Sequence, residues 1–513
     1  MRPALDGHAG IPQEARLLFR GLSTLDGLQI EGLLQSSNRV IARGLPLAGT
    51  AALAAMTADQ RIQSLSRVVI ALRHQERQRV LERWSDNLQR RTAPTAMMLR
   101  SLFGRYEPLG HFEAKPFRDF IWREMFARTL PVDDFETVTG ADFRVARVPW
   151  NAAHASALLT KAMGHALYPR LDTRGFDVMI AETPYPGRVA AGTQMVVRYH
   201  DAIPLLMPHT ITDKAFHQAS HYEALRRNVA CGAWFACVSD ATRRDLLSIF
   251  PELEPRTVTI HNMVSHHYHA EDDCSPERIY EIVRTRRNPA VNGVEPDASR
   301  WAGGATSRTR RGAVFKGVEF DAQRWVNRPL DYLLMVSTIE PRKNHHTLLA
   351  AWEQLRVQRY PQLKLIIVGS LGWDHEPIVR RFRPWLQRGE VQMLEEVPAA
   401  ELRLLYHHAR ATVCPSFGEG FDFSGVEAMR CGGAVVASDI PVHRDIYRDA
   451  AEFFNPYSPR ALAEALVRVI DPTSRSRRDG LIGLGASVSA DYVPQKILPQ
   501  WREFLMGLRR KPA

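Results

Sequence analysis

The chain has 513 residues, of which 45% are hydrophobic and 24% are charged. This length exceeds what one hydrophobic core holds and the composition excludes a disordered chain, so we expect a globular protein of two or three domains. The net charge of +11 leaves open a nucleic acid, an anionic membrane surface, phosphorylated ligands or a compositional preference for arginine. No zinc-finger spacing, RNA-binding motif or basic zipper accompanies the charge, so we expect no nucleic-acid partner.

The N-terminal sequence lacks the apolar core of a signal peptide, and the most apolar stretch, residues 44–56, is shorter than the roughly 20 residues of a membrane span. The five cysteines include no C-x-x-C pair, which is typical of reduced thiols. We therefore predict a cytoplasmic protein. A helical pattern over about 61–100 has a basic face formed by Arg67, Arg73, Arg77, Arg79 and Arg83. This face is either solvated or in peripheral contact with the inner face of an anionic membrane.

Four strand-like runs follow in the N-terminal half, each ending in polar or proline-bearing residues: 176–181, 194–201, 234–240 and 257–262. Short continuous apolar strands of this kind indicate a parallel sheet. We assign residues 1–268 to an N-terminal Rossmann-like domain. Residues 269–328 are rich in Gly, Ser, Pro and Arg without a sustained period, which predicts a linker or a mobile insertion.

The C-terminal half alternates strands with helices of ten to fifteen residues, and the expected strands are 332–336, 363–369, 391–394, 411–415, 434–438 and 452–454. This alternation predicts a doubly wound parallel sheet over residues 329–490. Residues 491–513 are expected to form a helix that crosses back to the N-terminal domain. Two α/β domains of this type bind ligands at the carboxyl ends of their strands, so a cleft between them is the expected site.

The stretch "PSFGEGFDFSGVEAM" places Glu419 on a glycine-bearing loop and Glu427 in the first turn of a helix that begins near Ser424. A helix N-terminus attracts phosphate through its free amides and its dipole. A nucleotide diphosphate lying there, with Glu427 on the ribose and Glu419 on the attached group, would explain the spacing. The alternative is that Glu427 only complements the helix dipole and Glu419 is a solvated loop residue.

The segment "STIEPRKN" follows the first strand of the same domain, at the same edge of the sheet, and contains Arg342 and Lys343. Cations at this edge can neutralise a departing diphosphate. The alternative for Lys343 is an ordinary solvated residue at the start of a helix.

Together these stretches resemble the retaining glycosyltransferases of family 4, whose GT-B fold has two Rossmann-like doubly wound parallel-sheet domains facing each other across a cleft. The resemblance is carried by the E-x7-E spacing of Glu419 and Glu427, by "PRKNHHTLLAAW", and by "YHDAIPL", which contains His200. It is continuous over about 332–470 and extends more thinly over 176–265.

The resemblance implies roles for individual residues. Glu419 would contact the donor sugar near its anomeric carbon, Glu427 the ribose, and Lys343 with Arg342 the diphosphate. His200, from the N-terminal domain, would be a second catalytic residue that reaches the donor sugar or the acceptor when the domains close. Further donor contacts would come from the loop residues Gly420, Phe421, Asp422, Phe423 and Ser424, and an early glycine loop would bring backbone amides to the acceptor or the phosphate through Gly7 and Gly10.

The implied activity is that of a hexosyltransferase that moves a hexose from a nucleotide sugar to a glycan or lipid-linked acceptor, with retention at the anomeric carbon. The segment "TIEPRKN" is similar to those of bacterial polysaccharide mannosyl- and rhamnosyltransferases, which makes GDP-mannose the first candidate donor. No D-x-D sequence occurs in the chain, so we expect no metal and no cofactor.

Three positions depart from the family pattern. Ser337 and Thr338 stand where many members have an arginine, Asp422 stands where glycine is common, and Ser424 replaces a frequent proline. The charge of Asp422 so close to a diphosphate is unexplained at this stage. Two other functions therefore stay open: a nucleotide-sugar epimerase of the same fold, and a non-catalytic protein that binds sugar nucleotides.

Overall fold

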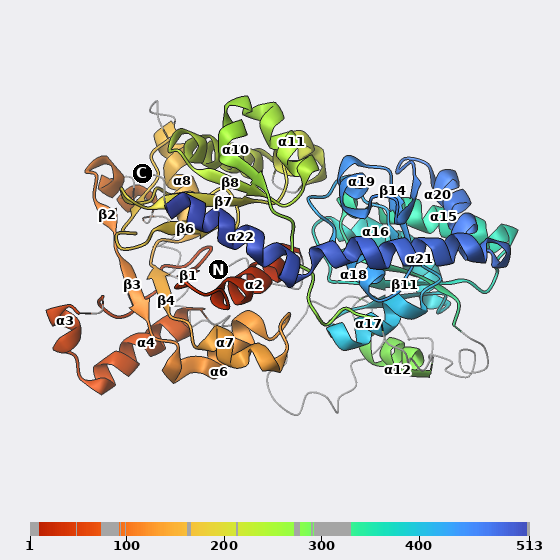
Figure 1. The fold of residues 1–513 in the computed structure, drawn as a ribbon, viewed down its shortest axis with the longest axis horizontal. Coiled ribbons are helices and arrows are strands. Elements are labelled where there is room, and N and C mark those ends of the chain that lie inside the picture. Colours follow the sequence, from red (N-terminus) through yellow and green to blue (C-terminus); the bar gives the residue numbers. More distant parts are fainter. Residues whose placement is uncertain are drawn as a thin grey trace. The chain divides into compact units, whose positions relative to one another are not determined.

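The computed structural model describes residues 10–509 apart from 48, 73–91, 93, 98, 162–165, 212–213, 271–276, 289–290 and 292–329. The chain divides into two compact units (Figure 1). Unit 1 consists of Met1–His209, Asp213–Ser265 and Val493–Ala513. Unit 2 consists of Thr210–Thr212 and His266–Tyr492.

Unit 2 contains a six-stranded sheet in the order β12-β11-β10-β13-β14-β15, in which all neighbouring strands are parallel. The strand order reverses between β10 and β13, so this is the topological switch point of a doubly wound sheet, where such folds bind ligands. The strands are β10 (Tyr332–Val336), β11 (Lys364–Val368), β12 (Val391–Leu394), β13 (Ala411–Cys414), β14 (Val435–Ser438) and β15 (Ala451–Phe454).

The strands of this sheet are apolar along most of their length because helices cover the sheet and bury its faces. The core between sheet and helices includes Leu333, Trp352 and Phe382, all fully buried. The helices are α15 (His345–Gln358), α16 (His375–Gln387), α17 (Ala399–His408), α18 (Phe423–Arg430), α19 (Pro441–Tyr447), α20 (Pro459–Ile470) and α21 (Arg475–Ser489). The six predicted strands of this unit are confirmed to within about one residue at each end.

Part of the segment expected to be a linker, 269–328, belongs to unit 2. Helix α12 (Glu277–Arg286) is fastened to α17 by Arg286, which donates to both carboxylate oxygens of Glu401 at 2.7 and 2.6 Å. The backbone N–H of Asn288 then donates to the carbonyl of Met393 at 2.9 Å, at the edge strand β12. The central part of the segment, 292–328, lies outside the described residues.

Unit 1 contains a four-stranded parallel sheet in the order β6-β7-β8-β9 and a separate three-stranded sheet in the order β1-β4-β3, in which β3 is antiparallel to β4. The parallel sheet was expected from the sequence, whereas the smaller mixed sheet was not. The strands are β1 (Gly32–Gln35), β2 (Tyr106–Glu107), β3 (Leu109–Phe112), β4 (Phe143–Ala146), β5 (Arg170–Leu171), β6 (Val178–Ala181), β7 (Gln194–Tyr199), β8 (Trp234–Cys237) and β9 (Thr257–Thr259). The α/β class, with a parallel sheet in each unit, is confirmed.

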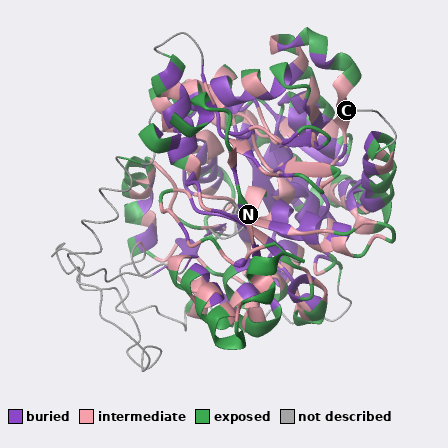
Figure 2. Cartoon of the chain, turned by 90° about the vertical axis from the view of Figure 1, so that its left-hand side faces the viewer, coloured by how far each residue is buried: buried purple, intermediate pink, exposed green. Residues whose placement is uncertain are grey.

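The C-terminal helix α22 (Pro494–Arg509) packs in unit 1 beside α2 (Gly10–Ser23), as Figure 1 shows. Trp501 of α22 is fully buried in the same core as Leu18 and Leu22 of α2. Buried residues fill the interior and exposed residues lie on the outer helices (Figure 2). The other α-helices of unit 1 are α3 (Ala51–Ala54), α4 (Ala58–Leu72), α6 (Arg118–Ile121), α7 (Phe135–Thr139), α8 (Trp150–Lys161), α9 (Ile203–Leu206), α10 (Lys214–Ala230) and α11 (Asp240–Ile249).

The basic helix expected over about 61–100 is described only in its first part, as α4. Leu65 and Val68 are its buried positions, while Arg67 is described and the other four arginines of the basic face lie outside the described residues. Among the helices that the structure describes, none combines the length and the apolar character needed to cross a bilayer.

At the end of β11, beside the switch point, the backbone of Gly369 lies so close to that of Ser337 that a larger residue should destabilise the protein. Gly369, at the end of β11, has a φ of 155°, and a Cβ there would lie 1.9 Å from the carbonyl oxygen of Ser337. We expect Gly369→Ala to destabilise the protein by about 3 kcal/mol in urea unfolding, because the backbone must move. The matched control is Gly480→Ala in α21, where a Cβ meets nothing within 4 Å and roughly 0.5–1 kcal/mol of stabilisation is expected. If Gly369→Ala and Gly480→Ala change the free energy of unfolding equally, the close contact of Gly369 with the Ser337 carbonyl is not present in the protein.

Candidate functional site

The loops that follow β10 and β13 are fixed to each other at the switch point of unit 2. Asn344 has a left-handed backbone (φ 58°), and its side-chain amide donates to the carbonyls of Pro415 at 3.0 Å and Pro456 at 2.8 Å. The backbone N–H of Phe417 donates to the carbonyl of Arg342 at 3.0 Å. Because these bonds join three strand ends, the side chains on the two loops are held in a defined geometry.

The two loops bring Glu419, Arg342 and Lys343 into direct contact. The guanidinium of Arg342 donates to Oε2 of Glu419 at 2.8 Å, and the ammonium of Lys343 donates to Oε1 at 2.6 Å. The three side chains are largely withdrawn from solvent, with 14%, 14% and 7% exposure for Arg342, Lys343 and Glu419. The structure therefore gathers three of the predicted site residues into one ion cluster.

Glu340 is a fourth member of this cluster that the sequence analysis missed. Its Oε1 accepts from the second guanidinium nitrogen of Arg342 at 2.9 Å, and its side chain is only 2% exposed. Burial raises the pKa of Glu340 above its ordinary value. It lies two residues before Arg342 in "TIEPRKN", so the signal was present in the motif.

The charges of the cluster favour the binding of an anion that replaces Glu419 as the partner of Arg342 and Lys343. Burial tends to raise the pKa of Glu419, but Arg342 and Lys343 outweigh it and hold that pKa below its ordinary value. Glu419 is therefore an ionised carboxylate that bridges two cations. An incoming anion with several oxygens, such as a diphosphate, can take over these cations in its place.

The charge of Asp422, which the sequence left unexplained, is satisfied within unit 2. Asp422 has a φ of 61° and caps α18: its Oδ1 accepts from the backbone N–H of Ser424 at 3.2 Å and from the Ser424 hydroxyl at 2.6 Å. Its Oδ2 lies 3.1 Å from Nε2 of His443, a fully buried side chain on α19. These partners, His443 first among them, hold the pKa of Asp422 far below its ordinary range despite burial.

This cap changes the expectation for the helix terminus. The amide of Ser424, one of those expected to face a diphosphate, is already bonded to the Asp422 carboxylate. A negative side chain at the helix N-terminus compensates the helix dipole itself. The anion-binding capacity of this edge therefore rests on Arg342 and Lys343 rather than on the first amides of α18.

The remaining predicted donor residues of unit 2 are mostly buried. The Oε2 atom of Glu427, which is 3% exposed, accepts from the hydroxyl of Tyr406 on α17 at 3.0 Å. Phe421 is buried against Phe423 and Tyr492, with ring centroids 5.2 and 5.3 Å apart. Gly420 is half-buried between Glu419 and Phe421. Phe421 and Ser424 therefore shape the loop from inside, and Glu427 is anchored to the neighbouring helix.

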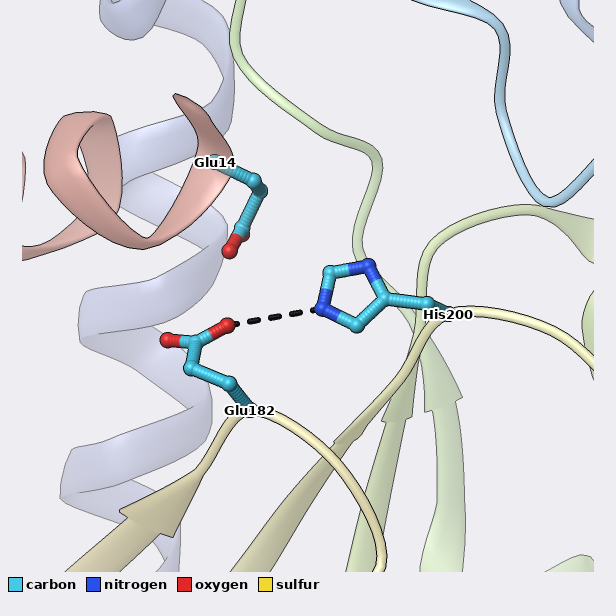
Figure 3. Close-up of side chains that lie close together, drawn as sticks. All are labelled: Glu14, Glu182 and His200. Carbon is cyan, nitrogen blue, oxygen red and sulfur yellow. Dashed lines mark hydrogen bonds and ion pairs between the residues drawn. The ribbon is translucent and has the colours of Figure 1, made fainter. Parts of the chain in front are cut away.

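His200 belongs to a buried polar cluster in unit 1 (Figure 3). It follows the last residue of β7, and Glu182 follows the last residue of the neighbouring strand β6, so both side chains lie at the carboxyl edge of the sheet. The Nε2 atom of His200 lies 3.4 Å from Oε2 of Glu182. Glu14, on α2, completes the cluster, and its Oε1 accepts from Nε of Arg198 at 3.0 Å.

Burial sets the protonation of this cluster. It raises the pKa of Glu14 to about 8, with the charge of Glu182 acting in the same direction and Arg198 opposing it. Burial also raises the pKa of Glu182, and it lowers the pKa of His200 to about 4. At neutral pH His200 is therefore uncharged and Glu14 carries a proton.

The early glycine loop is described only in part. Gly10 is exposed and begins α2, whereas Gly7 lies outside the described residues. Glu14 and Glu182 were missed by the sequence analysis. Glu182 was visible as the polar residue that ends the strand 176–181, but nothing in the sequence of α2 singles out Glu14, which meets the other two only through tertiary packing.

Unit 1 contains a cavity of about 450 Å³. This cavity contains none of the predicted site residues and is lined by Leu205, Leu206, Ala215, Gln218, Ala219, Tyr222 and Ile249.

Comparison with known families agrees with the geometry of unit 2. Residues 319–479 match the family model described as glycosyl transferases group 1. This part of unit 2 is therefore similar to group 1 glycosyltransferases. The matched range contains Glu340, Arg342, Lys343, Glu419 and Glu427, so the charged residues discussed at this edge lie within it.

Curated relatives match about a quarter to a third of the chain. The O-antigen chain mannosyltransferase B of Escherichia coli is 32% identical over 143 residues, which are 28% of this chain and 38% of that protein. The serotype-specific mannosyltransferase WbdA of Escherichia coli is 30% identical over 165 residues, 31% of this chain and 20% of that protein. The phosphatidyl-myo-inositol mannosyltransferase of Mycobacterium tuberculosis is 33% identical over 139 residues, 26% of this chain and 35% of that protein. The chain thus matches well under half the length of these relatives.

Solved structures are similar to a large part of the chain at low sequence identity. Sucrose-phosphate synthase from Thermosynechococcus elongatus has a TM-score of 0.49 at 17% identity, covering 71% of this chain and 83% of that one. HepE of Anabaena in complex with UDP has a TM-score of 0.48 at 16% identity, covering 77% of this chain and 94% of that one.

The protonation of Glu14 predicts how stability depends on pH. Folded Glu14 keeps its proton up to about pH 8, whereas an unfolded glutamate loses it near 4.5. Its contribution is therefore complete below pH 4.5 and is lost as the pH rises through about 8. Glu14→Gln cannot titrate, so between pH 6.5 and 8 wild type should lose up to about 1.4 kcal/mol per pH unit relative to the variant.

Thermal or urea unfolding of both proteins at pH 6.5 and pH 8 measures this difference. The range from pH 6.5 to 8 avoids the titration of His200. The pKa of His200 is lowered to about 4, so its contribution to the free energy of unfolding is lost only as the pH falls from about 6.5 toward 4. Parallel pH curves for wild type and Glu14→Gln would show that Glu14 is ionised in the folded protein.

Proposed function

We propose that this chain is a retaining glycosyltransferase of family 4 that moves a hexose, with mannose as the first candidate, from a nucleotide sugar to a glycan or lipid-linked acceptor. The observation that carries the proposal is the cluster of Glu419, Arg342 and Lys343 at the switch point of the group 1 domain. A glycosidic phosphate donor needs cations on its diphosphate and a carboxylate near its anomeric carbon. The cluster offers both within one set of contacts.

In the proposed reaction Arg342 and Lys343 bind the diphosphate, and the Glu419 carboxylate released from them moves to the hydroxyl groups of the sugar and stabilises positive charge at its anomeric carbon. The bond between that carbon and the diphosphate oxygen breaks, and the acceptor oxygen bonds to the carbon from the same face. The acceptor proton goes to the departing diphosphate. His200 binds a sugar hydroxyl, and Glu427 binds the ribose.

Arg342 and Lys343 supply the positive charge that a metal ion provides in other transferases, so we propose that the reaction needs no metal at the diphosphate. Mannose as the transferred sugar is supported by the names of the relatives, which are mannosyltransferases. We propose GDP as the nucleotide because the segment "TIEPRKN" resembles those of bacterial mannosyltransferases. Two of these names refer to O-antigen chains or serotypes, which favours a polysaccharide acceptor. We propose that this acceptor is reached in the cytoplasm or at the inner face of the membrane.

Binding of the donor class is tested first by thermal shift with GDP-mannose, UDP-glucose, dTDP-rhamnose and ADP-glucose. A sugar nucleotide at about 100 times its Kd stabilises the folded protein by about 2.7 kcal/mol, so one of the four should raise the melting temperature. Release of the nucleoside diphosphate in the presence of a glycan acceptor, with chelator added, then tests transfer. Isomerised nucleotide sugar without acceptor would instead indicate an epimerase, and binding without turnover over a broad acceptor panel a non-catalytic protein.

Glu419→Gln separates binding from chemistry. The uncharged amide releases Arg342 and Lys343, so we expect the variant to bind a nucleoside diphosphate about tenfold more tightly in isothermal titration, an effect of about 1.4 kcal/mol. Transfer should fall by at least about a hundredfold, because the charge beside the anomeric carbon is lost. The control is Glu401→Gln, which removes the partner of Arg286 in the same unit and should change neither quantity. Full activity of Glu419→Gln would refute the assigned role.

A further inference from the structure

The two ring nitrogens of His200 have different surroundings. Nε2 faces the carboxylate of Glu182 at 3.4 Å, whereas Nδ1 lies on the other side of the ring and points away from both glutamates (Figure 3). The main chain on either side of the ring is fixed: the hydroxyl of Thr242 donates to the carbonyl of His200 at 3.3 Å, and the N–H of Ile203 donates to Asp201 at 3.0 Å. Nε2 is therefore directed at a carboxylate of the protein, and Nδ1 is directed away from both carboxylates.

The carboxylates decide which nitrogen carries the proton. The Oε2 atom of Glu14 is buried and receives no hydrogen bond within the described structure, which is the situation of a carboxyl oxygen that holds a proton. The side-chain hydrogen bond between Glu14 and Glu182 raises the pKa of Glu14 and lowers that of Glu182, so Glu14 is the carboxyl that keeps the proton and Glu182 is the one that ionises first. An ionised carboxylate only accepts hydrogen bonds, so the neutral imidazole must offer it an N–H.

The charges around the cluster agree with this state. Arg198 is fully buried beside Glu14 and is itself held by the carbonyl of Ile260 and by the side chain of Asn262 at 2.7 Å. Its guanidinium also lies over the ring of Trp501, 5.2 Å from the centroid. With Glu14 neutral, Arg198 balances the one negative charge on Glu182, and no charge is required on His200. Asp201 is the other acidic group that acts on the ring.

We propose that Glu182 is a positioning residue that holds His200 as the Nε2–H tautomer, so that Nδ1 is a hydrogen-bond acceptor for a sugar hydroxyl. This inference rests on the proposed function only for the identity of the hydroxyl. The tautomer itself belongs to unit 1 and does not depend on transfer. Glu14 and Arg198 support it by keeping one negative charge, and not two, beside the ring.

A divalent cation is the competing occupant of this cluster. One ligand atom each from Glu14, Glu182 and His200 lie within 4.8 Å of one another. A metal bound at Nε2 would need the lone pair of that nitrogen, and the proton would then sit on Nδ1. The two alternatives therefore predict opposite tautomers, which makes the distinction measurable.

The test is long-range 1H–15N NMR of the full chain labelled with 15N-histidine, at pH 7.5 with and without Mn2+ or Zn2+. Comparison with His200→Gln identifies the signals of His200. We expect the Nε2–H pattern in wild type, unchanged by either metal. An Nδ1–H pattern, or a metal-dependent change that Glu14→Gln abolishes, would overturn the proposal.

Variants at Glu182 test the positioning role. Glu182→Leu removes the acceptor and should give a mixture of tautomers, with kcat/KM lower by about tenfold, the effect of one lost hydrogen bond. Glu182→Gln keeps an acceptor oxygen, so it should retain mostly the Nε2–H tautomer and most of the wild-type kcat/KM. Nucleoside diphosphate binding, which resides in unit 2, should be unchanged in both variants. A single Nε2–H tautomer in Glu182→Leu would contradict the role of Glu182 whether or not the protein transfers sugar.

The matched control is Asp142→Leu, because His111 and Asp142 form another histidine–carboxylate pair in unit 1, with Nε2 and Oδ2 3.3 Å apart. This substitution should change the signals of His111 and leave those of His200 as in wild type. If Asp142→Leu shifts His200 as strongly as Glu182→Leu does, the effect is a general one on unit 1 and the proposal fails.

Discussion

The bridge that Glu419 makes between Arg342 and Lys343 is the interaction on which the rest of the site depends. It joins the loop after β13 to the loop after β10 where the strand order of unit 2 reverses. Two cations gathered at one edge would repel each other and lose solvation unless an anion lay between them. Glu419 is that anion within the chain, and a diphosphate has the charge and the oxygens to replace it. The same contact therefore stabilises the site and defines its ligand.

The scaffold around this bridge explains why it is precise. Asn344 adopts a left-handed backbone and joins three strand ends through its amide, and Glu340 fixes the far side of the Arg342 guanidinium. Asp422 caps α18 and is held by His443, so its charge serves the loop and does not oppose the ligand. Asp422, which the sequence suggests as a ligand contact, therefore positions the loop instead, and the side chains that can reach a ligand are held in place by it and its neighbours.

Much of unit 2 could be predicted from the sequence, because its strands are short apolar runs and its helices have clear ends. The gathering of Glu419, Arg342 and Lys343 follows from strand order and was predicted as one site. The partners of Asp422 and Glu427 could not be, since His443 and Tyr406 lie on other helices and meet them only in the folded unit. In unit 1 the mixed sheet of β1, β4 and β3 was missed, because its strands are four residues long and far apart in the sequence. The contact between Glu14 and His200 was missed for a similar reason, because residues far apart in the sequence meet only in the folded unit.

The most direct test of the central claim is a crystal structure of the protein with GDP bound. We predict that diphosphate oxygens lie within hydrogen-bond distance of Arg342 and Lys343, and that the Glu419 carboxylate has left at least one of these cations. A diphosphate bound elsewhere, with Glu419 still bonded to both, would contradict it.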